Sequence, residues 1–142
     1  MRAAVEAARA QSFPFVLTAR AENFLVGRPN LADAITRLQA YQEAGADVLY
    51  APGLTKEADI RSVVASVDRP VNVVMGLMNS PFDVTALSRM GVKRISVGSA
   101  LARLAYGALQ EAAAEMLERG TFRYADRAAP YGVLNRLFAP RA

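Results

Sequence analysis

The stretch FVLTARAENFL, residues 15–25, organises the fold of this chain. It opens with a continuous apolar run, which is typical of a strand covered on both faces in a parallel sheet. It ends by placing Arg20, Glu22 and Asn23 within four residues. Because the carboxyl ends of parallel strands build the ligand sites of α/β folds, these polar residues predict a binding site at the end of the strand.

The alternation of an apolar run with a helical pattern continues along the chain. Strands are predicted over 14–20, 46–52, 71–76 and 92–98, and helices over 2–11, 31–45, 55–67, 80–90, 99–120 and 131–138. Strands joined by helices imply parallel pairing with right-handed connections. Units of about 25–30 residues have the period of a (β/α)8 barrel. The sequence therefore predicts an α/β half-barrel of four parallel strands alternating with helices, with an open parallel sheet as the alternative.

Local signals mark where several of these helices begin and end. Asn30 is placed to cap the start of its helix, and Gly45 is placed to end it. Thr55 is the expected N-cap of the next helix. Ser80 is the expected N-cap of the fourth, with Pro81 at its first helical position.

Length and composition set limits on the class of protein. The 142 residues are 53% hydrophobic, which fits one domain with a packed core. We treat residues 1–142 as a single domain, with four βα units over about 14–120 and a helical tail over 121–142. No cysteine or histidine occurs, so disulfides, thiolate zinc sites and Ser-His-Asp chemistry are excluded for these residues.

Charge and hydropathy argue against two kinds of partner. The net charge is +4, but the cations are scattered and form no run of like charge, so we expect no nucleic-acid partner. No apolar run has the length of a membrane span, and the N-terminal residues lack the apolar core of a signal peptide. We expect a cytoplasmic protein with no membrane partner and a small anionic substrate.

Four segments together are similar to a known family. They are FVLTARAENFL, AYQEAGADVLYAPGL, PVNVVMG and LSRMGVKRISVGSALARLAYGAL. In order and spacing they resemble the isocitrate lyase / phosphoenolpyruvate phosphomutase superfamily. The resemblance implies a (β/α)8 barrel, of which this chain matches the C-terminal half. It also implies an enzyme that makes or breaks C–C or P–C bonds in small 2-oxo acids, carboxylates or phosphonates.

The resemblance further implies a magnesium cofactor whose ligands are not in this chain. In the family, the Mg²⁺-binding acidic cluster and a Cys-bearing loop lie on the N-terminal half of the barrel. This chain has no cysteine, and it has Ala51, Pro52 and Gly53 where lyases of the family often carry a Glu. The sequence therefore leaves open whether the chain alone is an enzyme.

Arg20 is the foremost candidate for substrate binding, because a guanidinium can bind a carboxylate or phosphate through two N–H donors. The resemblance implies the same contact, and the alternative is a structural ion pair with Glu22. Glu22 is the catalytic candidate, since it can orient Arg20, hold a metal through water or move a proton. The alternative for Glu22 is a solvated loop residue, and Asn23 is interpreted as a turn former.

Further substrate-binding candidates lie on the last two predicted strands. Asn72 is an amide inside an apolar strand, where it needs partners, either a ligand or a neighbouring strand. Gly98 and Ser99 join a strand to a helix whose N-terminal N–H groups can bind an anion, or they only cap that helix. Gly76 and Asn79 are weaker candidates for the same edge.

The remaining arginines and the aromatic tail are interpreted as surface or packing groups. In the family, the last helix often reaches another subunit, and the segment 122–138 is a candidate for that role. The arginines assigned to solvated faces or subunit contacts are Arg94, Arg103, Arg119, Arg123 and Arg127.

Half of a barrel has two open strand edges, which predicts a partner. We expect a homo-oligomer or a complex with a separate N-terminal half, and not a stable monomer. Two alternative functions remain: a non-catalytic interaction or scaffold half-barrel, and a half-barrel that binds the phosphate of a sugar phosphate.

Overall fold

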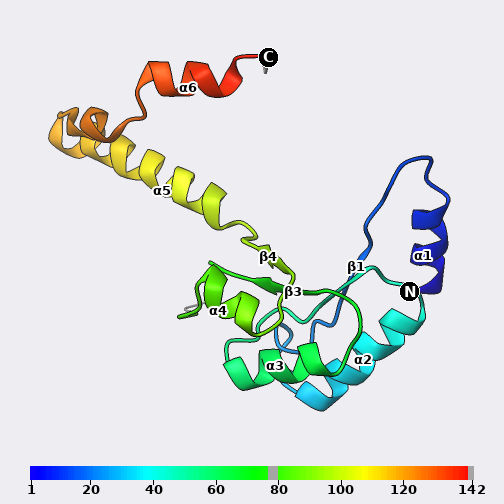
Figure 1. Ribbon diagram of the computed structural model, residues 1–142. Helices are drawn as coiled ribbons and strands as arrows, with labels where there is room; N and C mark the ends of the chain where they lie inside the picture. Colours follow the sequence, from blue (N-terminus) through cyan, green and yellow to red (C-terminus); the bar gives the residue numbers. More distant parts are fainter. Residues whose placement is uncertain (77–79, 141–142) are drawn as a thin grey trace. The chain divides into compact units, whose positions relative to one another are not determined.

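The computed structural model describes residues 1–76 and 80–140. Its sheet has four parallel strands in the order β1 (Thr18–Arg20), β2 (Val48–Tyr50), β3 (Val71–Val74) and β4 (Arg94–Ser96). The helices of this region are α1 (Arg2–Arg9), α2 (Leu31–Glu43), α3 (Glu57–Ala65) and α4 (Val84–Arg89) (Figure 1). The predicted alternation of parallel strands and helices is confirmed.

Strand register sorts the side chains of the sheet onto two faces. Arg20 pairs with Tyr50, Tyr50 with Asn72, and Asn72 with Arg94. Paired residues of neighbouring strands point to the same face, so these four form one row across the whole sheet. We call Arg20, Tyr50, Asn72 and Arg94 the polar row.

The other face of the sheet is apolar and belongs to the core. Ala19 pairs with Leu49, and Leu49 pairs with Val71, with all three buried. Burying a leucine side chain stabilises a fold by about 1.5–3 kcal/mol, so this face and its helices hold most of the local stability. The helical residues of the same core cluster are Ala34 and Leu38 of α2, Ile60 and Val63 of α3, and Leu87 of α4.

Asp47 links the start of β2 to β1 and α1. Its Oδ2 accepts a hydrogen bond of 2.9 Å from the backbone N–H of Leu17, and its Oδ1 pairs at 2.9 Å with Arg9. The Leu17 N–H is the main cause of the lowered pKa of Asp47. The negative charge of Asp47 therefore stabilises the entry into the first strand pair.

The helix boundaries confirm one predicted start and correct two. The side chain of Asn30 caps α2 by accepting from Asp33 N at 3.0 Å, as predicted. Helix α3 begins after Lys56 and not after Thr55, with Glu57 and Asp59 in the first turn facing the positive end of the helix dipole. Helix α4 begins after Asp83 and not after Ser80, because Asp83 Oδ1 accepts from Ala86 N at 2.7 Å.

The chain divides into two compact units, residues 1–100 and 101–142. The second unit holds most of α5 (Ala100–Ala114), then η1 (Glu115–Arg119), η2 (Arg123–Arg127) and α6 (Tyr131–Phe138). Its internal tie is the buried carboxylate of Glu115, which accepts from Thr121 Oγ1 at 2.7 Å and Arg123 N at 2.6 Å. The prediction of a single domain with a helical tail stays a prediction.

Large apolar side chains remain exposed in the second unit. They include Leu101, Leu104, Tyr106, Leu109, Leu117, Phe122, Tyr131, Leu137 and Phe138. An exposed apolar area of this kind marks an interaction surface more often than a free surface. Within the described residues, no helix combines the length and the apolar character that crossing a membrane requires.

Candidate functional site

A hollow of about 310 Å³ lies on the polar-row face of the sheet. Every strand contributes to its wall, because alternate residues of each strand point to the same side. Its described lining residues are Thr18, Arg20, Leu25, Tyr50, Val74, Arg94, Ser96 and Gly98. The hollow thus brings Arg20 and Gly98 together, although they lie on the first and last units of the sheet.

Arg20 is held in place by a carboxylate and by an aromatic ring. Its Nε donates to Glu22 Oε1 at 2.6 Å, and its Cζ lies 5.0 Å from the centre of the Tyr50 ring. The hydrogen bond with Glu22 is the main reason why the pKa of Arg20 lies above its ordinary value. Because the Arg20 side chain is still 50% exposed, the oriented guanidinium remains accessible to a ligand.

Asn72 is buried, with 1% of its surface exposed, and both ends of its amide have partners. Its Oδ1 accepts from Arg94 Nη1 at 2.8 Å, and its Nδ2 donates to Ser96 Oγ at 3.0 Å. Both partners are on the neighbouring strand β4 and both line the hollow. The structure thus places the amide behind two lining residues, and a direct contact between Asn72 and a ligand stays a prediction.

Tyr50 lies between Arg20 and Asn72 in the polar row. It is 7% exposed, and burial is the main cause of its raised pKa. A neutral phenol ring beside a guanidinium provides a favourable cation–π surface without adding charge to the hollow. Tyr50 therefore shapes the wall beside Arg20.

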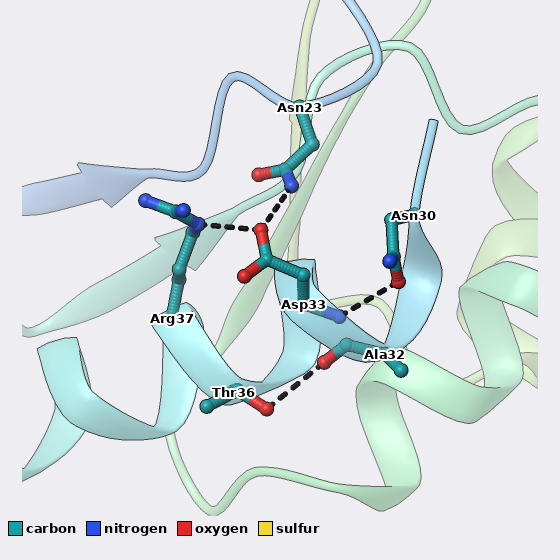
Figure 2. A network of polar contacts seen from close by, with 6 residues as sticks. All are labelled: Asn23, Asn30, Ala32, Asp33, Thr36 and Arg37. Carbon is teal, nitrogen blue, oxygen red and sulfur yellow. Dashed lines mark hydrogen bonds and ion pairs between the residues drawn. The ribbon is translucent and has the colours of Figure 1, made fainter. Parts of the chain in front are cut away.

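The loop that follows Arg20 is fixed onto helix α2 by a polar network (Figure 2). Asn23 is buried and donates from Nδ2 to Asp33 Oδ2 at 2.5 Å. Arg37 Nε donates to the same oxygen at 2.7 Å, and this bond is the main cause of the lowered pKa of Asp33. Asn23 also has the predicted role in a turn, because its carbonyl accepts from Arg28 N at 2.9 Å.

The loop after β2 packs closely against the loop after β1. Gly53 has a φ of +95°, and a Cβ at this position would lie 2.8 Å from the Cβ of Phe24. Glycine is thus required both for the backbone conformation and for the close approach. Together with Asn23, this contact limits how far the Arg20–Glu22 segment can move.

The other predicted site residues do not all line the hollow. Gly98 lines the hollow, whereas Ser99 is exposed and is not among the described lining residues. Gly76 follows β3 with a φ of +78°, and Asn79 lies outside the described residues. The substrate-binding roles of Gly98 and Ser99 and the catalytic role of Glu22 stay predictions.

Among the wall residues that sequence reasoning missed are Tyr50, Arg94 and Ser96. Arg94 was assigned to a solvated face or a subunit contact, but the structure places it on the same face as Arg20. A usable signal was present, because Arg94 and Ser96 are polar at alternate positions of a predicted strand. Which of the two faces they occupy follows only from the register of all four strands.

The described residues do not fit a magnesium site. Within 1–76 and 80–140, no group of three or more acidic, histidine or cysteine side chains gathers in a way that could hold a metal ion. Mg²⁺ prefers several oxygen ligands in octahedral geometry, and carboxylates usually supply the protein's share. We therefore assign no residue of this chain to the metal and derive no step through it.

Comparison with known proteins identifies the family. The family model for phosphoenolpyruvate phosphomutase matches residues 1–117. Among curated proteins, the chain is 35% identical over 133 residues to a phosphonopyruvate hydrolase from Variovorax sp. (strain Pal2), covering 90% of this chain and 44% of the relative.

Solved structures show the same likeness. The structure of a candidate lyase/mutase from Burkholderia cenocepacia J2315 superposes with a TM-score of 0.91 and 55% identity, covering 98% of this chain and 50% of that one. A phosphonopyruvate hydrolase in complex with oxalate and Mg²⁺ superposes with a TM-score of 0.72 and 27% identity, covering 94% of this chain and 48% of that one. The chain spans about half the length of these relatives, and it belongs to the phosphoenolpyruvate phosphomutase family.

Proposed function

We propose that this chain forms the anion-binding wall of a lyase or phosphomutase acting on small 2-oxo acids, carboxylates or phosphonates. The observation that supports this most is the position of Arg20, which ends β1, lines the hollow and is half exposed. A guanidinium in this position can neutralise a carboxylate or phosphoryl group through paired N–H donors. The hydrolase relative that was solved with oxalate supports the same ligand chemistry.

In this proposal the neighbouring groups assist Arg20. Glu22 orients the guanidinium through its 2.6 Å bond, and its carboxylate is the group closest to Arg20 that can exchange a proton with a ligand. Backbone N–H groups near Gly98 and Ser99, at the start of α5, would help to stabilise negative charge on the ligand.

Oxalate binding tests the proposal directly. Isothermal titration calorimetry would compare the 142-residue chain with Arg20→Met, which keeps much of the side-chain length but removes the charge. Because a hydrogen bond to a charged group contributes about 1.5–3 kcal/mol, we expect at least about a tenfold loss of oxalate affinity. Arg61→Met is the matched control, because Arg61 pairs with Glu57 on the exposed side of α3. Equal binding by the parent and Arg20→Met would contradict the proposal.

We also propose that the chain alone has no significant lyase activity, since it spans about half of its relatives. A coupled assay for release of pyruvate or glyoxylate, run with Mg²⁺, measures this. Turnover by the parent chain that disappears in Arg20→Ala would overturn the expectation of an incomplete enzyme and would strengthen the role of Arg20.

The sheet edges support a partner as part of the functional unit. In the described part of the chain, β1 pairs with β2 and β4 pairs with β3, so both β1 and β4 are edge strands. We propose that a second copy or a separate N-terminal half completes the sheet. A well-folded monomer at micromolar concentration, measured by size-exclusion chromatography with light scattering, would refute this.

A non-catalytic interaction module is the second candidate, and the exposed apolar side chains of residues 101–140 favour it. The two candidates differ in one measurable property. An interaction module would form a stable complex with its partner but would not bind oxalate through Arg20, whereas the proposed enzyme wall requires oxalate binding.

A further inference from the structure

The polar row contains a second cation that faces the same hollow as Arg20. Arg20 is the last residue of β1 and Arg94 is the first residue of β4, at opposite ends of the row. Three strand spacings separate their backbones, which is about 14 Å at about 4.8 Å per spacing in a flat sheet. Both side chains line the hollow.

Both guanidinium groups lean toward the middle of the row. The Arg20 guanidinium lies over Tyr50 of β2, with Cζ 5.0 Å from the ring centre. The Arg94 guanidinium reaches Asn72 of β3, with Nη1 2.8 Å from Oδ1. Strands β2 and β3 are neighbours, so the charged groups are drawn over adjacent strands although their backbones are at opposite edges.

The charges of the two arginines are balanced differently. Arg20 forms an ion pair with Glu22, whereas the described contact of Arg94 is to a neutral amide oxygen. No ion pair of Arg94 is found within residues 1–76 and 80–140. A guanidinium has five N–H donors, and Asn72 Oδ1 occupies one of them, so the Arg94 side of the hollow retains positive charge and donors for an anion.

Asn72 is the group that sets the direction of Arg94. Its amide is buried, and its Nδ2 is fixed by Ser96 Oγ at 3.0 Å, so its Oδ1 is left facing Arg94. An amide oxygen can only accept, and therefore it orients a guanidinium without neutralising it. A carboxylate at the same place would orient Arg94 equally well but would cancel its charge.

We propose that Arg94, positioned by Asn72, is a second anion-binding group of this hollow, and that it binds the second anionic group of a ligand whose first is bound by Arg20. The inference rests on the proposed function, because it assumes that the hollow is the ligand site. In this proposal, Arg94 determines how strongly the hollow prefers ligands with two anionic groups over ligands with one.

The test compares two ligands of matched size that differ by one charge. Malonate and monomethyl malonate would be titrated into the 142-residue chain by calorimetry at pH 7.5. The parent is expected to bind malonate about tenfold more tightly, since a second charged hydrogen bond is worth more than about 1.4 kcal/mol. The preference is also expected to fall with added salt, because exposed charges are screened.

Two variants remove the second charge in different ways. Arg94→Met deletes the guanidinium, and Asn72→Asp keeps it but pairs it with a carboxylate of the same shape. Both variants are expected to reduce the preference for malonate to about twofold or less, with the affinity for the monoester changed by less than about twofold. Arg94→Lys, which keeps the charge, is expected to retain part of the preference. Arg61→Met controls for the loss of net charge, and circular dichroism checks the fold of each variant.

The outcomes separate the two proposals. If Arg20→Met abolishes binding while Arg94→Met and Asn72→Asp leave the preference for malonate unchanged, Arg94 only supports the sheet and the inference is wrong. If Arg94→Met and Asn72→Asp weaken both ligands equally, the inference is also wrong. If the parent binds neither ligand, both the inference and the proposed function fail.

Discussion

The two faces of the four-stranded sheet differ in burial and in charge, although they share one backbone. The apolar face places Ala19, Leu49 and Val71 against the buried side chains of the helices. The opposite face carries the polar row, in which two arginines remain exposed and the two residues between them are buried. Burial therefore concentrates stability on the apolar face, and we expect the exposed arginines of the other face to be replaceable at lower structural cost.

Leu49→Ala, on the apolar face, is expected to cause the largest loss of stability. Leu49 is fully buried at the centre of the apolar face, so truncation leaves a cavity that the surrounding core fills only in part. We expect a loss of about 3 kcal/mol in the free energy of unfolding, measured by urea titration. A loss below about 1 kcal/mol would mean that the core around β2 is loosely packed.

Gly53→Ala tests whether the loops at the ligand end are as constrained as the core. The new Cβ would meet Phe24 at 2.8 Å, and the backbone would have to keep a φ of +95°. Strain of this kind costs about 2 kcal/mol, and a local shift of the Phe24 loop would also move Arg20. Urea unfolding gives the stability, and oxalate titration of the same variant reports the position of Arg20.

Asn72→Ala tests the more deeply buried of the two middle residues of the polar row. The substitution removes two hydrogen bonds, but it leaves Arg94 near solvent, where water can replace the amide. We expect a loss of about 1.5 kcal/mol, smaller than that of Leu49→Ala. A loss equal to that of Leu49→Ala would show that both faces hold the fold equally.

Asp47 makes the stability of the pairing between β1 and β2 depend on pH. Its folded pKa is lowered, first by the Leu17 N–H and then by Arg9, so its contribution is present above the unfolded pKa of about 3.9. That contribution is lost as the pH falls through the lower folded pKa. Asp47→Asn is expected to cost about 1 kcal/mol at neutral pH, with the difference from the parent shrinking below about pH 4. A difference that does not change with pH would exclude the carboxylate as its cause.

Arg61→Ala is expected to cause the smallest loss of stability among these variants. Arg61 is half exposed, and its bond to Glu57 is an i, i+4 pair on the surface of α3. Exposed pairs of this kind contribute about 0.3–0.5 kcal/mol, so the midpoint of urea unfolding should hardly move. A larger loss would point to the bond between Arg61 Nη1 and the carbonyl of Arg89.

The repeating apolar runs were sufficient to predict the four strands and their order. The burial on both faces that such runs indicate is found along β2, but β1 and β4, at the edges of the sheet, are partly exposed. The sequence also singled out Arg20, Glu22 and Asn23, since they stand at the end of such a run. Of the three, Arg20 lines the hollow, and the binding role of Arg20 and the catalytic role of Glu22 stay predictions. The boundary of α4 was misplaced because Asp83 competes with Ser80 as the capping residue, and only the folded geometry decides between them.

Arg94 could not be assigned in the same way, because its role depends on residues far away in the sequence. Its neighbours in the row come from three other strands, and the contact with Asn72 spans 22 positions along the chain. A shift of one residue in the pairing of β3 with β4 would turn Arg94 to the opposite face. Register is a property of the assembled sheet, and the periodicity within one strand does not predict it.

The polar row takes one residue from each of the four strands, and each strand belongs to a separate strand–helix unit. Under the proposed function, ligand preference would therefore be modular. Exchange of a single unit, by recombination or in the laboratory, would replace one side chain of the row and keep the other three. New specificities can in this way be sampled one unit at a time.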